Sequence, residues 1–346
     1  MNIVHGKDIH FVMKNIDHNT ANNNGMLLLL CCCMLLVAAM GCRNRHPRPV
    51  PGEERVLVLP GGAEMTMIYC PPGTFLMGSP EDEEGRSADE VQHEVALISG
   101  FWLGKTEVTQ AQWCSVMGCD PFEEQEEWEG DEMYPLRGDR YVWPLQGCNP
   151  SWIRGPDYPV HNLMRARCQL FVEKINKKKF GVRVMLPTEA QWEYACRAGS
   201  AGPFAGTNVD ELAWHEEGNL EARTGGQPPV RKKMKWGNAV PDDGWWHPHP
   251  IARKSPNAWG FHDMHGNVAE WCLDGYGPYG GDGMDPIGQA TRDGYGGELY
   301  VLRGAFPDDP GRRDAASCRS AVRYGREDIH CEGPCGFRLA ATEDSL

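Results

Sequence analysis

The sequence has no excess of basic residues. It contains 34 Lys and Arg against 48 Asp and Glu, a formal net charge of −14. Nucleic acids and anionic membrane surfaces attract proteins through basic patches. The acidic balance therefore excludes nucleic acid as an expected partner, and it argues against charge-driven binding to an anionic lipid surface.

The sequence also lacks an apolar run of membrane-spanning length. The run at residues 26–40 has fifteen residues, whereas a spanning helix needs about 20 and a signal-peptide core about 7–15. It ends at Gly41-Cys42, and small residues before a cysteine resemble a bacterial lipobox. We expect residues 1–41 to be a signal peptide and Cys42 to carry lipid. A plainly cleaved signal and an uncleaved anchor are the alternatives, and all three readings predict export.

Beyond the leader, no second linker and no repeat interrupts the chain. Residues 42–64 form a Pro- and Arg-rich stretch that we interpret as a lipid-anchored tether, followed by one domain over 65–346. The chain contains 41 Gly, 26 Pro and 12 Trp. This composition favours loops, short strands and aromatic anchors over a helical or doubly wound fold.

Local signals predict three helices and two strands. Strands are expected in 71–78 and 101–107, where turn residues precede apolar runs. Capping boxes begin at Thr109 and Thr188 and predict a helix after each, with Gly199 ending the second of these. An apolar stripe predicts another helix from about Leu163 to Lys178.

Seven motifs in a fixed order resemble the formylglycine-generating-enzyme (sulfatase-modifying-factor) family. They are PPGTFLMGS, FWLGKTEVTQAQW, LPTEAQWEYACRAG, NAWGFHDMHGNVAEW, VLRGA, CRSAVR and GFRLA, and they extend over roughly residues 65–342. The resemblance implies a compact α+β domain, similar to C-type lectins, with much irregular loop structure. Fold alone does not fix the function, because the family includes oxidases and members without known chemistry.

The resemblance implies two calcium sites. The first consists of Asp263, Gly266, Val268 and Glu270, which offer the carboxylate and carbonyl oxygens that Ca²⁺ prefers. The second consists of Asn219, Leu220, Asp243 and Trp245. The alternative for Asp263 and Glu270 is that they cap turns through hydrogen bonds.

The copper chemistry of the family is not expected here. The resemblance places a Cu(I)-binding pair of thiolates a few residues after Arg303, and thiolates are the ligands that select Cu(I). This chain has no cysteine from Arg303 to Ser317, and Ala269 stands where the family has a Trp in the substrate pocket. We therefore expect no formylglycine formation.

Export makes the cysteines disulfide candidates. The chain has 14, of which ten lie in the domain. Cys119 and Cys148 bracket a segment that interrupts the family pattern, so we predict a bond that closes this acidic insertion at 119–148. The resemblance pairs Cys196 with Cys318, with Cys272 as competitor. Further open alternatives are a Cys331–Cys335 bond, a bond from either of them to Cys168, and inert buried thiols at Cys168, Cys196 and Cys272.

Three weaker signals have ordinary structural readings that we prefer. The acidic insertion suits a cationic partner, but a solvated surface is the simpler interpretation. His262 and His265 have zinc-ligand spacing without an evident third ligand. Trp245, Trp246 and Trp259 suit sugar stacking, but in loop-rich domains such residues more often pin loops to the core.

Two classes of function follow from the sequence. The favoured one is a calcium-stabilised, non-catalytic binding or structural module, anchored to the membrane by lipid and facing the periplasm or the cell surface. Its partner would be an envelope protein or a glycan. The alternative is an exported oxidoreductase of the family that acts through a different centre.

Overall fold

The computed structural model describes residues 49–118, 134–135, 141–142, 155–177, 183–215, 232–233, 239–240, 248–304, 314–328 and 333–342. The chain divides into two units, Met1–Arg48 and Pro49–Leu346, and all the described residues lie in the second. Among the described helices, none is long and apolar enough to cross a membrane. The predicted lipid site, Cys42, lies outside the described residues.

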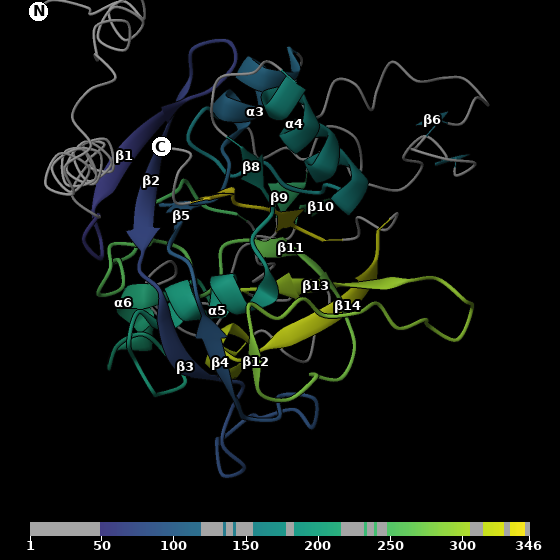
Figure 1. Ribbon diagram of the computed structural model, residues 1–346. Coiled ribbons are helices and arrows are strands. Elements are labelled where there is room, and N and C mark those ends of the chain that lie inside the picture. The colour runs from purple at the N-terminus through teal and green to yellow at the C-terminus, as the bar shows by residue number, and fades with distance from the viewer. Residues whose placement is uncertain are drawn as a thin grey trace, which may run out of the picture. The chain divides into compact units, whose positions relative to one another are not determined.

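A five-stranded antiparallel sheet joins the beginning and the end of the domain (Figure 1). Its order is β1-β2-β5-β16-β8, and the strands are β1 (Glu54–Val58), β2 (Glu64–Cys70), β5 (Phe101–Gly104), β16 (Ala340–Thr342) and β8 (Val184–Met185). Strand β16 lies between β5 and β8, with Ala340 opposite both Leu103 and Met185. The family motif GFRLA (336–340) therefore leads into an inner strand of this sheet.

A four-stranded sheet is built from strands of the C-terminal part of the chain, in the order β14-β13-β11-β15. It is built from β11 (Ala269–Gly275), β13 (Leu299–Arg303), β14 (Arg323–Glu327) and β15 (Cys335–Gly336), and β15 runs parallel to β11. A three-stranded sheet combines β3 (Gly73–Met77), β4 (His93–Leu97) and β12 (Gly283–Met284). Two short hairpins complete the strands: β6 (Tyr134–Pro135) with β7 (Tyr141–Val142), and β9 (Lys232–Lys233) with β10 (Ala239–Val240).

The helices begin where the sequence provides caps. Helix α3 (Gln110–Met117) follows Thr109 and helix α5 (Glu189–Arg197) follows Thr188, each with a complete capping box. Helix α4 (Arg165–Lys177) coincides closely with the predicted helix. Helix α6 (Val209–Leu212) and the 3-10 helix η3 (Ala315–Cys318) are single turns. The chain is otherwise mostly short strands and loops, which confirms the expected α+β class.

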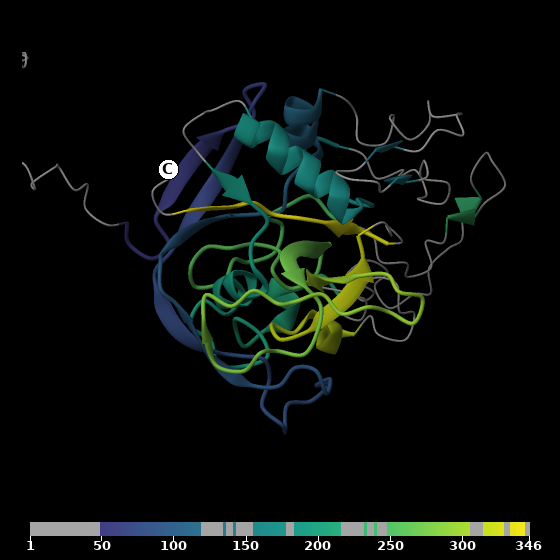
Figure 2. The same cartoon turned by 45° about the vertical axis from the view of Figure 1, so that its right-hand side comes forward.

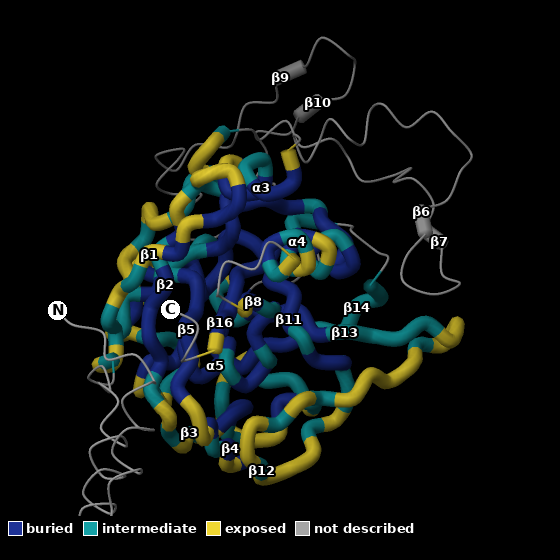
Figure 3. The backbone as a smooth tube through the Cα atoms, turned by 45° about the horizontal axis from the view of Figure 1, so that its top comes forward, coloured by how far each residue is buried: buried dark blue, intermediate teal, exposed yellow. Residues whose placement is uncertain are grey.

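Large aromatic residues fill the core between these elements. Trp113 of α3 stacks on Phe171 of α4 at 5.4 Å between ring centroids, and Phe337 meets Phe171 edge-on at 5.3 Å. Accordingly α3 and α4 lie side by side in both views (Figures 1 and 2). Figure 3 shows β2, β5 and α5 as largely buried, whereas the loop at β12 is mostly exposed. Burial of aromatic rings supplies much of the stabilisation of such a domain.

The domain boundary needs a correction. The predicted tether extends to residue 64, but β1 already pairs with β2 from Glu54 onward. Leu57 is buried between exposed Val56 and Val58, the alternation of a strand with one face on the core. The folded domain therefore begins before residue 65.

Candidate functional site

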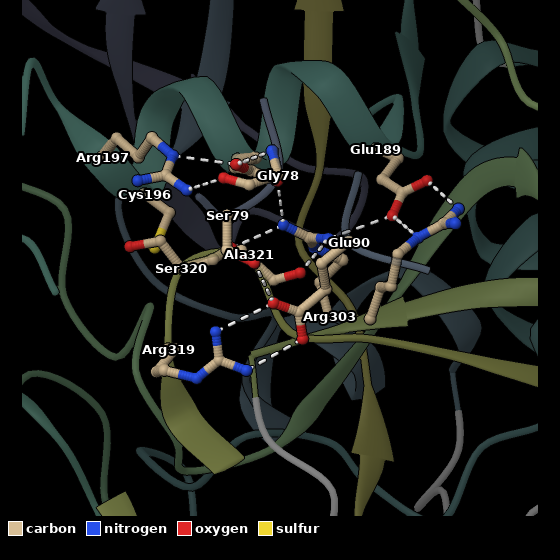
Figure 4. A network of polar contacts seen from close by, with 12 residues as sticks. Gly78, Ser79, Glu90, Glu189, Cys196, Arg197, Arg303, Arg319, Ser320 and Ala321 are labelled. Carbon is tan, nitrogen blue, oxygen red and sulfur yellow. Dashed lines mark hydrogen bonds and ion pairs between the residues drawn. The ribbon is translucent and has the colours of Figure 1, made fainter. Parts of the chain in front are cut away.

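Helix α5 carries two buried glutamates that face β13. Glu189 and Glu193 are four residues apart, so their side chains project from one face of the helix. Arg303, at the end of β13, donates to Glu189 at 3.0 Å and to Glu193 at 2.5 Å, and also to the main-chain oxygens of Ser320 and Ala321 (Figure 4). We call these contacts the Arg303 network.

Three more arginines extend the Arg303 network. Arg323 binds both oxygens of Glu189, at 2.8 and 2.7 Å, and Arg197 donates to Glu193 at 2.8 Å. Arg319 binds both oxygens of Glu90 at 2.9 Å (Figure 4). Removing one partner of a buried ion pair costs about 3–5 kcal/mol. These guanidinium groups are already paired, so the family motif around Arg303 holds α5, β13 and β14 together.

A second buried cluster lies at the turn after Phe261. Glu270 accepts from both sides of the Arg338 guanidinium, at 2.6 Å to each oxygen, and from the Trp192 indole at 2.9 Å. Asp263 accepts from the Ala252 amide at 2.7 Å and from the Trp214 indole at 3.2 Å. Both predicted calcium ligands therefore have protein donors.

Glu107 is the unexpected member of this cluster. It is fully buried, and neither of its carboxylate oxygens has a hydrogen-bond partner among the described residues. Burial raises the pKa of Glu107 well above its usual range, and the nearby Asp263 and Glu270 raise it further against the opposing effect of Arg338. Burial also raises the pKa of Asp263. Three carboxyl groups thus surround one guanidinium.

The turn itself explains the spacing in the Asp263–Glu270 motif. Asp263 and Gly266 have φ values of 56° and 102°, in the left-handed region. A Cβ at Gly266 would lie 2.4 Å from the main-chain oxygen of Trp214, so only glycine fits. Val268 is fully buried. These features are those of a tight turn. They favour the alternative in which Asp263 and Glu270 have a structural role through hydrogen bonds.

The carboxylates of this cluster fit a bound cation only in part. An orphaned buried carboxylate at Glu107 is a suitable hard ligand for Ca²⁺. Glu270 does not fit, since Arg338 engages both of its oxygens. No group of three His, Cys, Asp or Glu side chains converges at metal distance within the described ranges. Sequence reasoning missed Glu107, which follows Lys105 and Thr106 after the end of β5 and carries no local signal of its burial.

The second predicted calcium site and several cysteines lie outside the described residues. These positions are Asn219, Leu220, Asp243, Trp245, Cys119, Cys148 and Cys331. The segment 305–313, after Arg303, lies outside them too.

Cys196 and Cys318 are free, buried thiols in the structure, and the bond between them stays a prediction for exported material. His265 connects their surroundings: its Nε2 lies 3.7 Å from the Cys196 sulfur, and its Nδ1 donates to the Cys318 oxygen at 2.8 Å. Burial raises the pKa of both thiols to about 12 and lowers the pKa of His265 to about 4. A thiol in this state is a poor copper ligand, because thiolate is the binding form.

His262 and Trp259, which the sequence suggested as a zinc ligand and a sugar-stacking residue, have contacts within the fold. His262 Nδ1 contacts the Lys254 oxygen at 2.9 Å, so with His265 already bonded the pair does not form a zinc site. Trp259 packs edge-on against Tyr194 at 5.0 Å. Cys168 and Cys272 are also free and fully buried.

The sheets, the capped helices and the buried arginine network together define an α+β domain of the sulfatase-modifying-factor type. The profile described as sulfatase-modifying factor enzyme 1-like domain matches residues 58–343. The chain therefore belongs to this family, and the resemblance read from its motifs is confirmed.

Individual relatives are distant. The chain is 29% identical over 193 residues to the chaperone protein LppX of Paenibacillus barcinonensis, which covers 51% of this chain and 63% of that protein, less than two thirds of it. It is 26% identical to the formylglycine-generating enzyme of Streptomyces coelicolor over 80% of this chain and 89% of the enzyme. PvdO from Pseudomonas aeruginosa superposes with a TM-score of 0.59 at 23% identity over 85% of this chain and 99% of PvdO, a likeness of fold.

Proposed function

We propose that this protein is an exported, lipid-anchored member of the sulfatase-modifying-factor family that serves as a non-catalytic binding or structural module stabilised by calcium. The observation that carries the proposal is the absence of cysteine from Arg303 to Ser317, where the family chemistry needs a thiolate pair. Arg303, at the start of this segment, is committed to Glu189 and Glu193.

Loss of copper chemistry follows from the ligands present. The segment after Arg303 offers carboxylates at Asp308, Asp309 and Asp314, and carboxylates hold Cu(I) weakly. Cys318 follows this segment but is buried with a raised pKa. One such thiol does not replace two thiolates.

A peptide assay tests this part of the proposal. The full-length chain in detergent is incubated with copper, oxygen and a sulfatase-derived peptide that carries Cys-x-Pro-x-Arg, and the product is analysed by mass spectrometry. We expect the cysteine to remain unmodified. Peptide aldehyde at catalytic turnover would establish the oxidase instead.

Calcium is proposed for the cluster around Glu107. Three buried carboxyl groups face the single positive charge of Arg338, and burying unpaired charge is costly. A divalent cation beside Glu107 and Asp263, completed by main-chain oxygens or water, would neutralise the excess. Glu107 thus takes the place of Glu270 as a side-chain ligand of calcium.

Anchoring is proposed through Cys42. The fifteen-residue apolar run and the small residues before Cys42 support it. An anchor at residue 42 leaves about a dozen residues before β1 begins at Glu54, which holds the domain near the membrane surface. The binding partner in this proposal is an envelope protein or a glycan, consistent with an acidic chain.

A further inference from the structure

A cavity of about 500 Å³ lies beside the Arg323 end of the Arg303 network, because Arg323 packs on two of its lining rings. It opens between the segment that leads into β4 and the segment that follows β11. Its walls include Asp89, Val91, His93, Tyr276, Pro278 and Tyr279. This volume is in the range of small-molecule sites, which are mostly apolar with a few polar groups.

The aromatic wall is held rigidly. Arg323 lies over the Tyr279 ring at 4.0 Å and over the Tyr276 ring at 4.8 Å, while its guanidinium pairs with Glu189. His93 packs on Tyr279 at 4.5 Å between ring centroids. Arg323 shares Glu189 with Arg303, and these contacts keep the rings in their orientation without a ligand.

Two side-chain polar atoms in the cavity wall lack a partner among the described residues, and both are acceptors. Asp89 Oδ2 accepts from the Tyr276 hydroxyl at 2.7 Å, whereas no contact is made by Oδ1. His93 Nδ1 contacts the Val91 main-chain oxygen at 2.9 Å and so carries the hydrogen, which leaves Nε2 as an acceptor in the neutral ring. Burial and the Asp89 carboxylate raise the pKa of Tyr276 to about 12, so its hydroxyl remains the donor to Asp89.

We propose that this cavity binds a small organic ammonium ion with an apolar body. The aromatic and aliphatic walls accept the body, and the ammonium group donates to Asp89 Oδ1 and His93 Nε2. Aromatic rings and a carboxylate are the groups that recognise organic cations. This site goes beyond the proposed function and depends on neither calcium nor the lipid anchor.

Other ligand classes fit the cavity less well. An anion finds no lysine in the lining, and the adjacent Arg323 is paired with Glu189. A sugar would need several donors and acceptors around its ring, but the Tyr276 hydroxyl and the Thr291 hydroxyl are already committed to Asp89 and to a main-chain oxygen. Among the described side chains of the lining, the acceptors at Asp89 and His93 are the polar atoms left open.

Isothermal titration of the full-length chain in detergent tests the proposal, with empty micelles as the blank. The probes are 2-phenylethylammonium, the neutral 2-phenylethanol, the anionic 3-phenylpropanoate and a methyl glycoside. Asp89→Asn removes the charge but keeps an acceptor for Tyr276. Asp82→Asn is the matched control, since Asp82 is an exposed acid of the same segment outside the cavity lining.

We expect saturable binding of the ammonium probe, at least tenfold weaker binding of the other three, and at least a tenfold loss in Asp89→Asn with none in Asp82→Asn. Val91→Trp places a large ring at the half-exposed rim and should also abolish binding. Unchanged melting temperatures show that the variants fold. Absence of saturable ammonium binding, equal binding of alcohol, anion or glycoside, or full affinity in Asp89→Asn would each overturn the proposal.

Discussion

Replacing Glu107 by glutamine separates the two ways in which its buried carboxyl can be accommodated. Without a cation, burial raises the pKa of Glu107 and favours its protonated form, and a glutamine side chain has nearly the same shape and no charge. The substitution should then change stability by little. With calcium bound, Glu107 is ionised and is a ligand, and glutamine removes the charge that attracts the ion.

The size of the effect follows from binding linkage. A ligand that binds only the folded state at a hundredfold excess over its dissociation constant adds about 2.7 kcal/mol to the free energy of unfolding. Each kcal/mol raises the melting temperature of domains of 150–250 residues by about 2–4 °C. Calcium should therefore raise the melting temperature of the wild type by about 5–10 °C, and chelator should reverse the increase.

The assay is thermal unfolding of the full-length chain in detergent, with calcium and with chelator. Glu107→Gln should lose most of the calcium response while melting near the chelated wild type. Glu94→Gln is the matched control, because Glu94 is exposed on β4. An unchanged wild-type melt on chelation refutes calcium binding, and a full calcium response in Glu107→Gln refutes the role of Glu107.

The same group sets the expected pH dependence. A carboxyl whose pKa is higher in the folded than in the unfolded chain stabilises the fold when protonated, and this contribution declines as pH rises from the unfolded value near 4 through the folded value. In chelator, raising the pH should therefore lower the stability that Glu107 contributes. Calcium requires the ionised form, so its affinity should increase with pH, and an affinity that decreases with pH contradicts the scheme.

Three further predictions concern the cysteines. Radiolabelled palmitate should enter the wild type and be lost in Cys42→Ala, and label retained in the mutant argues against acylation at Cys42. Peptide mapping of exported material without reduction should link Cys119 to Cys148, and alkylation of either thiol in that material rules the bond out. Exported material should also contain Cys196 linked to Cys318, whereas chain made in a reducing cytoplasm keeps both thiols free as in the structure; peptides of Cys196 linked to Cys272 would favour the competitor.

Local signals predicted the helices well because each cap is encoded within a few residues. Thr109 with Gln112 and Thr188 with Gln191 form the two capping boxes, and neither depends on distant contacts. The sheet order could not be read in this way. Strand β16 pairs with β5 across more than 230 residues, and nothing local at Ala340 specifies that partner.

The polar clusters, like the sheet order, could not be predicted from local signals. The motif spacing brought out Asp263 and Glu270, but the pairing of Glu270 with Arg338 spans 68 residues. Glu107 lies far from all three in the sequence, and it acquires its significance only when the fold removes it from water. Cys42, Cys119 and Cys148 remain predictions, because they lie outside the described residues.

The family motifs of this chain report its architecture more directly than its chemistry. Arg303, Arg323 and Glu189 form one buried ion cluster, and losing Glu189 would leave the buried Arg323 without its carboxylate partner. These motifs therefore contribute to folding whatever the chemistry of the domain. A pair of cysteines after Arg303 takes no part in this ion cluster, so its absence leaves none of these buried charges unpaired. A chain can thus retain every motif that defines the fold while the thiolates disappear, and this is the pattern from Arg303 to Ser317.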